Sequence, residues 1–396
     1  MLRQVEGSKA VADAVAACAP EVICAYPISP QTHIVEGLSQ LVKSGELKNC
    51  EFINVESEFA AMSVAIGSSA TGARTYTATA SQGLLYMVEA VYNASGLGLP
   101  IVMTVANRAI GGPINIWNDH SDSMSQRDCG WLQLYAENNQ EAVDLHIQAF
   151  KIAEEMSMPV MVCMDGFILT HAYEQVDIPT AEEVAGFLPP FVPRQQLDPA
   201  DPVSIGAMVG PESFMEVKYL AHQRMIDSER VVKRVAEEFE AHFGRKTGGL
   251  LRTYRAEGAE TVVLALGSII GTLKDVIDEL QLDGHSIGVL GLTSFRPFPY
   301  DALAAALRDA KRVIILEKAF STGTGGIVTL DVARAIEGMD IKDFTVIAGL
   351  GGRPITIASL SNYLMNAMNE NIDRTTFLDL EVDTVEIEIN KERALR

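Results

Sequence analysis

Tyr26-Pro-Ile-Ser-Pro30 directly follows a short apolar run, Val22-Ile-Cys-Ala25, and precedes a segment whose apolar residues have helical spacing. Two more polar stretches follow apolar runs in the same way: Val55-Glu-Ser-Glu58, and Asn107-Arg108 through Asp119-His120-Ser-Asp122. In parallel α/β sheets the ligand crevice lies outside the carboxyl ends of the strands. We therefore expect a helix N-terminus, two carboxylates and an arginine to converge on one cleft that suits an anionic substrate or cofactor.

Composition limits the class of protein. The 396 residues are too many for one ordinary core, so two domains are expected. Hydrophobic residues make up 48% of the chain and charged residues 21%, which is typical of a well-buried globular protein. A net charge of −21 argues against binding to nucleic acid or to an anionic membrane, because both require basic patches.

The five cysteines are scattered along the chain without C-x-x-C spacing, which is typical of reduced thiols in a cytosolic protein. We therefore expect no zinc or iron–sulfur site built by this chain alone, and no metal ligands are assigned. The N-terminus lacks the apolar segment of a signal peptide. The longest uncharged apolar run, Thr261 to Leu273, is shorter than the roughly 20 residues that cross a bilayer. These features predict a cytoplasmic location.

Strand and helix signals alternate over residues 1–178, which predicts a mainly parallel, doubly wound sheet. Strands are expected at residues 22–25, 52–55, 75–79, 100–105 and 160–163. The helix after Pro30 is expected to end near Gly45, and others should follow Glu58, span Ser81 to about Ala94, and span Gln140 to Met156.

The composition changes after residue 178. Seven of the 16 prolines lie between Pro179 and Pro211, which indicates an extended crossing segment, and Phe214 to Phe243 reads as a long charged helix. We assign residues 179–256 to this crossing segment and helix. A second α/β domain is expected over residues 257–396, with buried strands at 261–266, 286–290, 312–316 and 344–348.

Each polar stretch also has a purely structural interpretation. Ser29 and Pro30 are suited to cap and begin a helix, and the N–H groups of that helix end could instead face an anion. Glu56 and Glu58 suit a helix's first turn, whereas one partly buried carboxyl with a raised pKa could transfer protons. Arg108 ends an apolar strand, so it must either form an ion pair or bind a substrate carboxylate.

Two further polar motifs are more typical of a structural role than of a catalytic or ligand-binding one. Asp119-His120-Ser-Asp122 contains types of residue that bind metals, but a lone H-x-D favours a polar loop. Thr322-Gly-Thr-Gly-Gly326 lacks the Gly-x-Gly-x-x-Gly spacing of a phosphate loop and is interpreted as a turn or a site of tight packing.

Taken together, the chain resembles the α subunits of the thiamine-diphosphate-dependent 2-oxoacid:ferredoxin oxidoreductases, most closely those that act on pyruvate. The similarity spans nearly the whole chain, and its motifs occur in order. They are Ala25-Tyr-Pro-Ile-Ser-Pro30, Val55-Glu-Ser-Glu58, Thr79-Ala-Ser-Gln-Gly83, Asn107-Arg-Ala109, Pro113 to Met124, Gln133 to Gln140, Asp165-Gly-Phe167 and Ile347 to Arg353.

The resemblance implies a thiamine-diphosphate pyrimidine-binding domain followed by a transketolase C-terminal-like α/β domain. Glu58 matches the glutamate that contacts the aminopyrimidine ring and favours its imino tautomer. Arg108 matches the arginine that binds the substrate carboxylate. Ser29 stands where the family usually has threonine beside the substrate, so a methyl group is missing there. The resemblance also assigns Tyr26, Pro27, Ile28 and Gln82 to cofactor binding.

The chain lacks other parts that the family's chemistry needs. Asp165-Gly166 and Asp283-Gly284 have no preceding glycine, so neither begins the Gly-Asp-Gly motif that holds magnesium and pyrophosphate. The resemblance implies that a β subunit supplies Mg²⁺ and an iron–sulfur cluster, that smaller γ- and δ-type subunits complete the enzyme, and that the site lies between subunits.

The implied activity is the oxidative decarboxylation of pyruvate with coenzyme A to acetyl-coenzyme A, with ferredoxin as acceptor, as in anaerobic metabolism. A branched-chain 2-oxoacid or 2-oxoglutarate is the alternative substrate. A non-catalytic assembly subunit is the alternative from another class, although the retained Glu58 and Arg108 argue against it. A nicotinamide-dependent dehydrogenase is disfavoured because no dinucleotide fingerprint is present.

Overall fold

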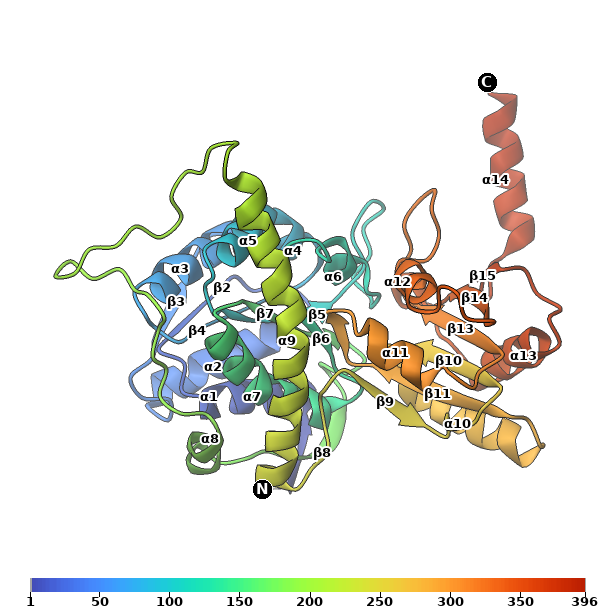
Figure 1. Ribbon diagram of the computed structural model, residues 1–396, viewed down its shortest axis with the longest axis horizontal. Coiled ribbons are helices and arrows are strands. Elements are labelled where there is room, and N and C mark those ends of the chain that lie inside the picture. Colours follow the sequence, from blue (N-terminus) through green and yellow to red (C-terminus); the bar gives the residue numbers. More distant parts are fainter. Residues whose placement is uncertain (1, 396) are drawn as a thin grey trace.

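The computed structural model describes residues 2–395 and shows two α/β units with a long helix, α9, lying along the first (Figure 1). The elements of the first unit and the crossing segment are β1 (Leu2–Glu6), α1 (Gly7–Ala17), β2 (Val22–Ala25), α2 (Thr32–Ser44), β3 (Glu51–Asn54), α3 (Glu58–Ala70), β4 (Thr75–Thr79), α4 (Ser81–Tyr86), α5 (Val88–Gly96), β5 (Val102–Asn107), α6 (Ser121–Ser125), β6 (Leu132–Tyr135), α7 (Asn139–Met156), β7 (Val160–Asp165), β8 (Tyr173–Asp177), α8 (Ala181–Phe187) and α9 (Phe214–Phe243).

The first unit is built on a seven-stranded sheet with the order β12-β6-β7-β5-β4-β2-β3. Its strands pair in parallel except at the β12 edge, which confirms the predicted doubly wound sheet. Helix α1 packs against both α2 and α7, and α3 packs against α5. On α2, the predicted apolar positions Ile34 and Leu38 are fully buried, and the helix ends at Gly45 in the left-handed conformation.

The second unit contains β9 (Leu251–Tyr254), β10 (Thr261–Ala265), α10 (Ile269–Leu282), β11 (Ile287–Leu292), β12 (Ser294–Arg296), α11 (Tyr300–Ala306), β13 (Arg312–Glu317), α12 (Val328–Ala335), β14 (Lys342–Ile347), η1 (Leu350–Gly352), α13 (Ile357–Met368), β15 (Thr375–Phe377) and α14 (Val382–Ala394). Its six-stranded sheet has the order β15-β14-β13-β10-β11-β9. The four predicted strands are its β10, β11, β13 and β14, and only β9 runs antiparallel.

Strand pairing crosses the expected boundary at residue 257 in both directions. Strand β9 lies before the boundary and pairs with β11, whereas β12 lies after it and pairs with β6 of the first sheet. One hydrophobic cluster also contains residues of both units, including Trp131 and Phe295. The division into residues 1–178, 179–256 and 257–396 therefore stays a prediction, but the two α/β units share packing.

Several local expectations need correction. Ser29 does not cap α2: the helix begins at Thr32, and the residue before it is Gln31. The expected single helix from Ser81 to Ala94 is divided at Met87 into α4 and α5. The long charged helix is confirmed with the expected bounds. Thr322 to Gly326 forms a turn next to a bridge between Ser321 and Gly325, as expected.

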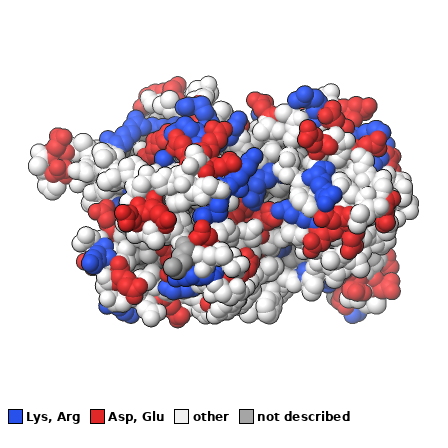
Figure 2. All heavy atoms as spheres, turned by 90° about the horizontal axis from the view of Figure 1, so that it is seen from below, with Lys and Arg blue, Asp and Glu red and all other residues white. Residues whose placement is uncertain are grey.

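None of the helices within residues 2–395 is both long and apolar enough to span a bilayer. On the face that Figure 2 shows, acidic and basic side chains are interspersed over both units.

Candidate functional site

The polar stretches meet at the carboxyl ends of β2, β4 and β5, at what we call the site edge. Strands β2, β4 and β5 are neighbours in the sheet, so the loops that follow them lie together. These loops contain Tyr26–Pro30, Ser81–Gly83 and Arg108, and the start of α3 brings Glu58.

Glu58 is the buried member of the two candidate carboxylates. Its side chain is 8% exposed, whereas Glu56 is exposed. Ser57 caps α3 by accepting a hydrogen bond from the Ala60 N–H at 3.2 Å, and this fixes the first turn that carries Glu58.

Glu58 packs against the backbone of Gly83 in the next loop. A Cβ at Gly83 would lie 2.7 Å from Glu58 Oε1, so this close approach requires glycine. Within residues 2–395, no donor forms a hydrogen bond or ion pair with the Glu58 carboxylate. Glu58 is not among the fully buried polar atoms that lack a partner, so its carboxylate still reaches solvent and can accept a hydrogen bond from water or from a bound molecule.

Arg108 is buried directly after β5 and is held by backbone carbonyls. Its Nε donates to the carbonyl of Asn115 at 3.1 Å, and one terminal nitrogen, Nη1, donates to the carbonyl of Ser29 at 3.0 Å. Burial lowers the pKa of the guanidinium, and Asp122 acts in the opposite direction. No carboxylate in the described part of the chain forms an ion pair with this guanidinium. The structural ion pair, which is one interpretation of Arg108, is therefore not formed within residues 2–395.

Asp122 joins the Arg108 loop to the Ser81 turn, and we did not assign it a role from the sequence. Its carboxylate is fully buried, and one oxygen accepts from the N–H groups of Ser81 at 2.9 Å and Arg108 at 3.0 Å. The other accepts from Asn107 Nδ2 at 2.8 Å and from the Ser123 N–H at 2.7 Å. Burial raises the pKa of Asp122 to about 6, against the lowering effect of these hydrogen bonds.

Gln82 and the Tyr26–Pro30 loop complete the site edge. A Cβ at Gly111 would lie 2.0 Å from Gln82 Nε2, so Gln82 packs on the loop that follows Arg108. The buried Gln31 shapes the other loop, because its amide donates to the carbonyls of Ala78 at 2.7 Å and Tyr26 at 3.2 Å. Tyr26, Pro27 and Ser29 remain exposed, and Ile28 is half-buried.

The second unit supports the loop between Arg108 and Asp122. Asn115 donates to the carbonyl of Gly351 at 3.1 Å, and the Gly351 N–H donates to Asp119 at 3.0 Å. Asp119 to Asp122 runs from this polar loop into α6, and both carboxylates accept hydrogen bonds within the described chain.

Asp165, at the end of β7, connects the two units. It contacts His120 at 2.6 Å, Lys318 at 2.9 Å and Ser268 at 2.5 Å. Although burial would raise it, Lys318 and His120 hold the pKa of Asp165 well below its usual range. Sequence reasoning missed Lys318, for which the only signal is a charged residue directly after a buried strand.

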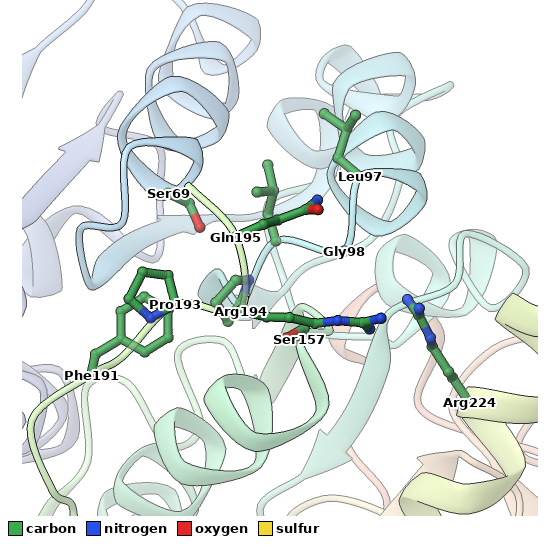
Figure 3. Close-up of a pocket in the computed structure, with 11 residues that line it drawn as sticks. Ser69, Leu97, Gly98, Ser157, Phe191, Pro193, Arg194, Gln195 and Arg224 are labelled. Atoms are coloured by element: carbon green, nitrogen blue, oxygen red, sulfur yellow. The ribbon is translucent and has the colours of Figure 1, made fainter. Parts of the chain in front are cut away.

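A separate pocket of about 110 Å³ lies under the crossing segment. Arg194 and Arg224 extend toward each other across it, and Ser69 and Ser157 are part of its lining (Figure 3). None of the residues assigned to the site from the sequence lines this pocket, so it is distinct from the site edge.

The fold and the site edge define an α/β protein with a ligand site at the carboxyl end of a doubly wound parallel sheet. Residues 13–237 match the family described as "Pyruvate flavodoxin/ferredoxin oxidoreductase, thiamine diP-bdg", and residues 259–360 match "Pyruvate:ferredoxin oxidoreductase core domain II". The chain belongs to this family of oxidoreductases.

The chain is also similar in sequence to individual oxidoreductase subunits. The chain is 49% identical to pyruvate synthase subunit PorA of Methanosarcina barkeri, with 91% of each chain covered. It is 45% identical to the PorA subunit of Methanocaldococcus jannaschii, with 96% of this chain and 98% of the relative covered. It is 40% identical to ketoisovalerate oxidoreductase subunit VorA of Pyrococcus horikoshii, with 89% and 90% covered.

The fold is also similar to that of a solved structure, the 2-oxoglutarate:ferredoxin oxidoreductase from Magnetococcus marinus. The TM-score is 0.68 at 18% sequence identity, and the match covers 92% of this chain. This chain spans 65% of the length of that chain.

Proposed function

We propose that this chain is the α subunit of a multi-subunit pyruvate:ferredoxin oxidoreductase that converts pyruvate and coenzyme A to acetyl-coenzyme A, CO₂ and reduced ferredoxin. The observation that carries the proposal is that the buried Glu58 and Arg108 lie at one site edge and that neither forms an ion pair within residues 2–395. The identity of 43–49% to several PorA subunits supports pyruvate as the substrate.

Glu58 fits thiamine diphosphate because its largely buried carboxylate has no donor within residues 2–395 and could accept a hydrogen bond from the cofactor's aminopyrimidine ring. Glu58 would accept this hydrogen bond and hold the proton that the ring nitrogen exchanges. Tyr26, Pro27, Ile28 and Gln82 would line the same ring from the two neighbouring loops. The cofactor, when bound, supplies the electron sink for decarboxylation of a 2-oxoacid.

Arg108 would bind the carboxylate of pyruvate. The carbonyls of Asn115 and Ser29 fix the guanidinium, and its Nη2 has no hydrogen-bond partner within residues 2–395, so a substrate carboxylate can accept hydrogen bonds there. Ser29 lies next to Arg108 through its carbonyl, and its exposed hydroxyl would face the substrate.

A β subunit would complete the site with Mg²⁺ and an iron–sulfur cluster, and smaller γ- and δ-type subunits would pass electrons to ferredoxin. Exposed apolar side chains around the site edge support this assembly, since such groups usually mark an interface. The larger ones are Tyr26, Phe59, Tyr86, Ile114, Ile116, Trp117 and Ile168.

We place the enzyme in the cytoplasm, because the five cysteines are free thiols. We expect neither nucleic acid nor a membrane among its partners, given the net charge of −21.

A branched-chain 2-oxoacid is the second candidate substrate, favoured by the 40% identity to the VorA subunit. The test is anaerobic purification of the native complex through a tag on this chain, followed by assay of coenzyme-A-dependent viologen reduction. Pyruvate, 2-oxoisovalerate and 2-oxoglutarate are compared by kcat/KM. We expect pyruvate to give the highest value. Activity with 2-oxoisovalerate alone would replace the substrate, and partners without any 2-oxoacid activity would favour an assembly subunit.

A further inference from the structure

Glu6, His33 and His171 form a cluster beside the site edge, which we call the histidine–glutamate cluster. Glu6 ends β1, His33 lies in the first turn of α2, and His171 lies between β7 and β8. One nitrogen or oxygen atom of each residue lies within 4.8 Å of the corresponding atoms of the other two. Because the three residues are far apart in the sequence, no spacing motif reveals them.

The contacts within the cluster have two explanations. His33 Nδ1 lies 2.7 Å from Glu6 Oε1, and the two imidazole rings lie 4.8 Å apart at 34°, which is consistent with a hydrogen-bonded pair and a tilted ring contact. The same two imidazoles and one carboxylate are also the ligand types of Zn²⁺ sites that keep one position open.

The geometry is near that of a metal site. Ligands at about 2.1 Å from a tetrahedral ion lie about 3.4 Å from one another, so atoms up to 4.8 Å apart must approach by up to about 1.4 Å. His33 is exposed and Glu6 is half-buried, so their side chains have room for this movement.

His171 is fixed in an orientation that suits a ligand. Its Nδ1 lies 2.7 Å from Thr170 Oγ1, and that buried hydroxyl also accepts the Phe167 N–H at 2.8 Å. If Nδ1–H donates to Thr170, the lone pair of Nε2 is left for an ion, as is usual for histidine ligands. The Phe167 ring, 4.9 Å from the His171 ring, restricts it further.

The structure thus points to a binding site for a divalent first-row transition ion of the Zn²⁺ type, held by Glu6, His33 and His171, with the fourth position open to water. Such an ion would join three segments next to the proposed substrate site. His33 lies on the helix that follows the Tyr26–Pro30 loop, and Phe167 contacts Trp117 of the Arg108 loop with ring centroids 4.9 Å apart.

The test measures metal binding by the full-length chain without any activity assay. The chain is stripped with a chelator, and Zn²⁺ and Co²⁺ are added separately; the dissociation constant is measured by calorimetry and tetrahedral Co²⁺ by its visible absorption. All variants carry Cys50→Ser, because Cys50 is the half-buried thiol, whereas Cys18, Cys24, Cys129 and Cys163 are buried.

We expect one equivalent of Zn²⁺ to bind, and His33→Ala and His171→Ala to weaken binding by about 100-fold or more. His285→Ala is the matched control, since His285 is exposed and far from the cluster in sequence. Glu6→Gln tests the carboxylate while keeping the size of the side chain, and Thr170→Val tests the orientation of His171, with about a tenfold loss expected.

Circular dichroism of each metal-free variant shows whether it folds. If Zn²⁺ does not bind the parent chain, or binds folded His33→Ala and His171→Ala as tightly as it binds His285→Ala, the proposed site is wrong. This outcome is independent of the 2-oxoacid assay, so the two proposals can fail separately.

Discussion

Two buried glutamates lie in the two α/β units in opposite situations. Glu58, at the first turn of α3, has no hydrogen-bond donor within the described chain. Glu317, the last residue of β13, accepts the N–H groups of Ile327, Val328 and Thr329 at 2.7 to 3.0 Å, and the Thr329 hydroxyl at 2.7 Å.

Burial raises the pKa of Glu317, against the lowering effect of these donors. Its carboxylate occupies the N-terminus of α12, so no ligand is needed to satisfy either the carboxylate or the helix end. The first unit leaves the Glu58 carboxylate free to accept a hydrogen bond from another molecule. The second unit supplies the donors to Glu317 from its own helix α12. Burial alone therefore does not distinguish a candidate catalytic carboxylate from a structural one, and the two glutamates differ in whether the described chain supplies donors to them.

The strongest test of this contrast is Glu58→Gln. We expect kcat of the assembled enzyme to fall by about 10² to 10⁴-fold, because the amide cannot exchange the proton at this position. Steady-state viologen reduction measures the change, and co-purification shows whether assembly persists. Glu56→Gln, two residues away on the exposed side, is the control and should retain near-normal activity. Normal turnover of Glu58→Gln would remove Glu58 from the mechanism.

Glu317→Gln should have the opposite profile. We expect the free energy of unfolding to fall by about 2–3 kcal/mol, because the new amide N–H₂ meets backbone donors instead of accepting from them. Urea denaturation of the full chain measures this loss. The assembled variant should keep most of its kcat. A large loss of kcat with unchanged stability would mean that Glu317 also belongs to the site.

Asp122 is a buried carboxylate at the site edge that, unlike Glu58, accepts hydrogen bonds from the chain itself. Its pKa is raised from 3.8 to about 6, so its stabilising contribution is fully present below pH 3.8 and is lost as the pH rises through 6. Between these values, the unfolding free energy of the wild type should fall relative to Asp122→Asn, by at most about 1.4 kcal/mol per pH unit.

Urea denaturation at pH 4.5, 5.5 and 6.5 measures the difference between the two proteins. Asp128→Asn, at an exposed side chain, is the control and should show no such change with pH. A difference between wild type and Asp122→Asn that does not vary with pH would contradict the raised pKa.

The smallest expected effect is that of Arg108→Ala on substrate binding. Removing a guanidinium that binds a carboxylate should raise KM for pyruvate by about tenfold or more, with a smaller change in kcat. Arg108→Lys should give a KM between those of the wild type and Arg108→Ala, because lysine keeps the charge but cannot form the bidentate hydrogen bonds of a guanidinium. Arg127→Ala, on the same stretch of chain, serves as control. An unchanged KM for Arg108→Ala would exclude Arg108 from the substrate site.

Much of the fold can be predicted from the sequence, because the spacing of apolar residues and the residues that end helices and strands are local properties of the chain. The apolar runs at 102–107 and 261–265 are buried on both faces, so they read as strands without any knowledge of their neighbours. The short edge strands β9 and β12 escape prediction, since their pairing depends on a partner distant in sequence. Ser29 does not cap α2 because it lies in a turn before the helix, in which the Gln31 N–H donates to the carbonyl of Ile28.

The residue types of the site are also fixed locally, because polar groups after apolar strands must gather at one edge of a parallel sheet. Three features of the site depend on which atoms come within hydrogen-bond distance. These features are which of Glu56 and Glu58 is buried, whether Arg108 forms an ion pair, and whether the N–H groups of α12 donate to Glu317. Only tertiary packing decides such contacts, since a shift of one residue or one ångström makes or removes them.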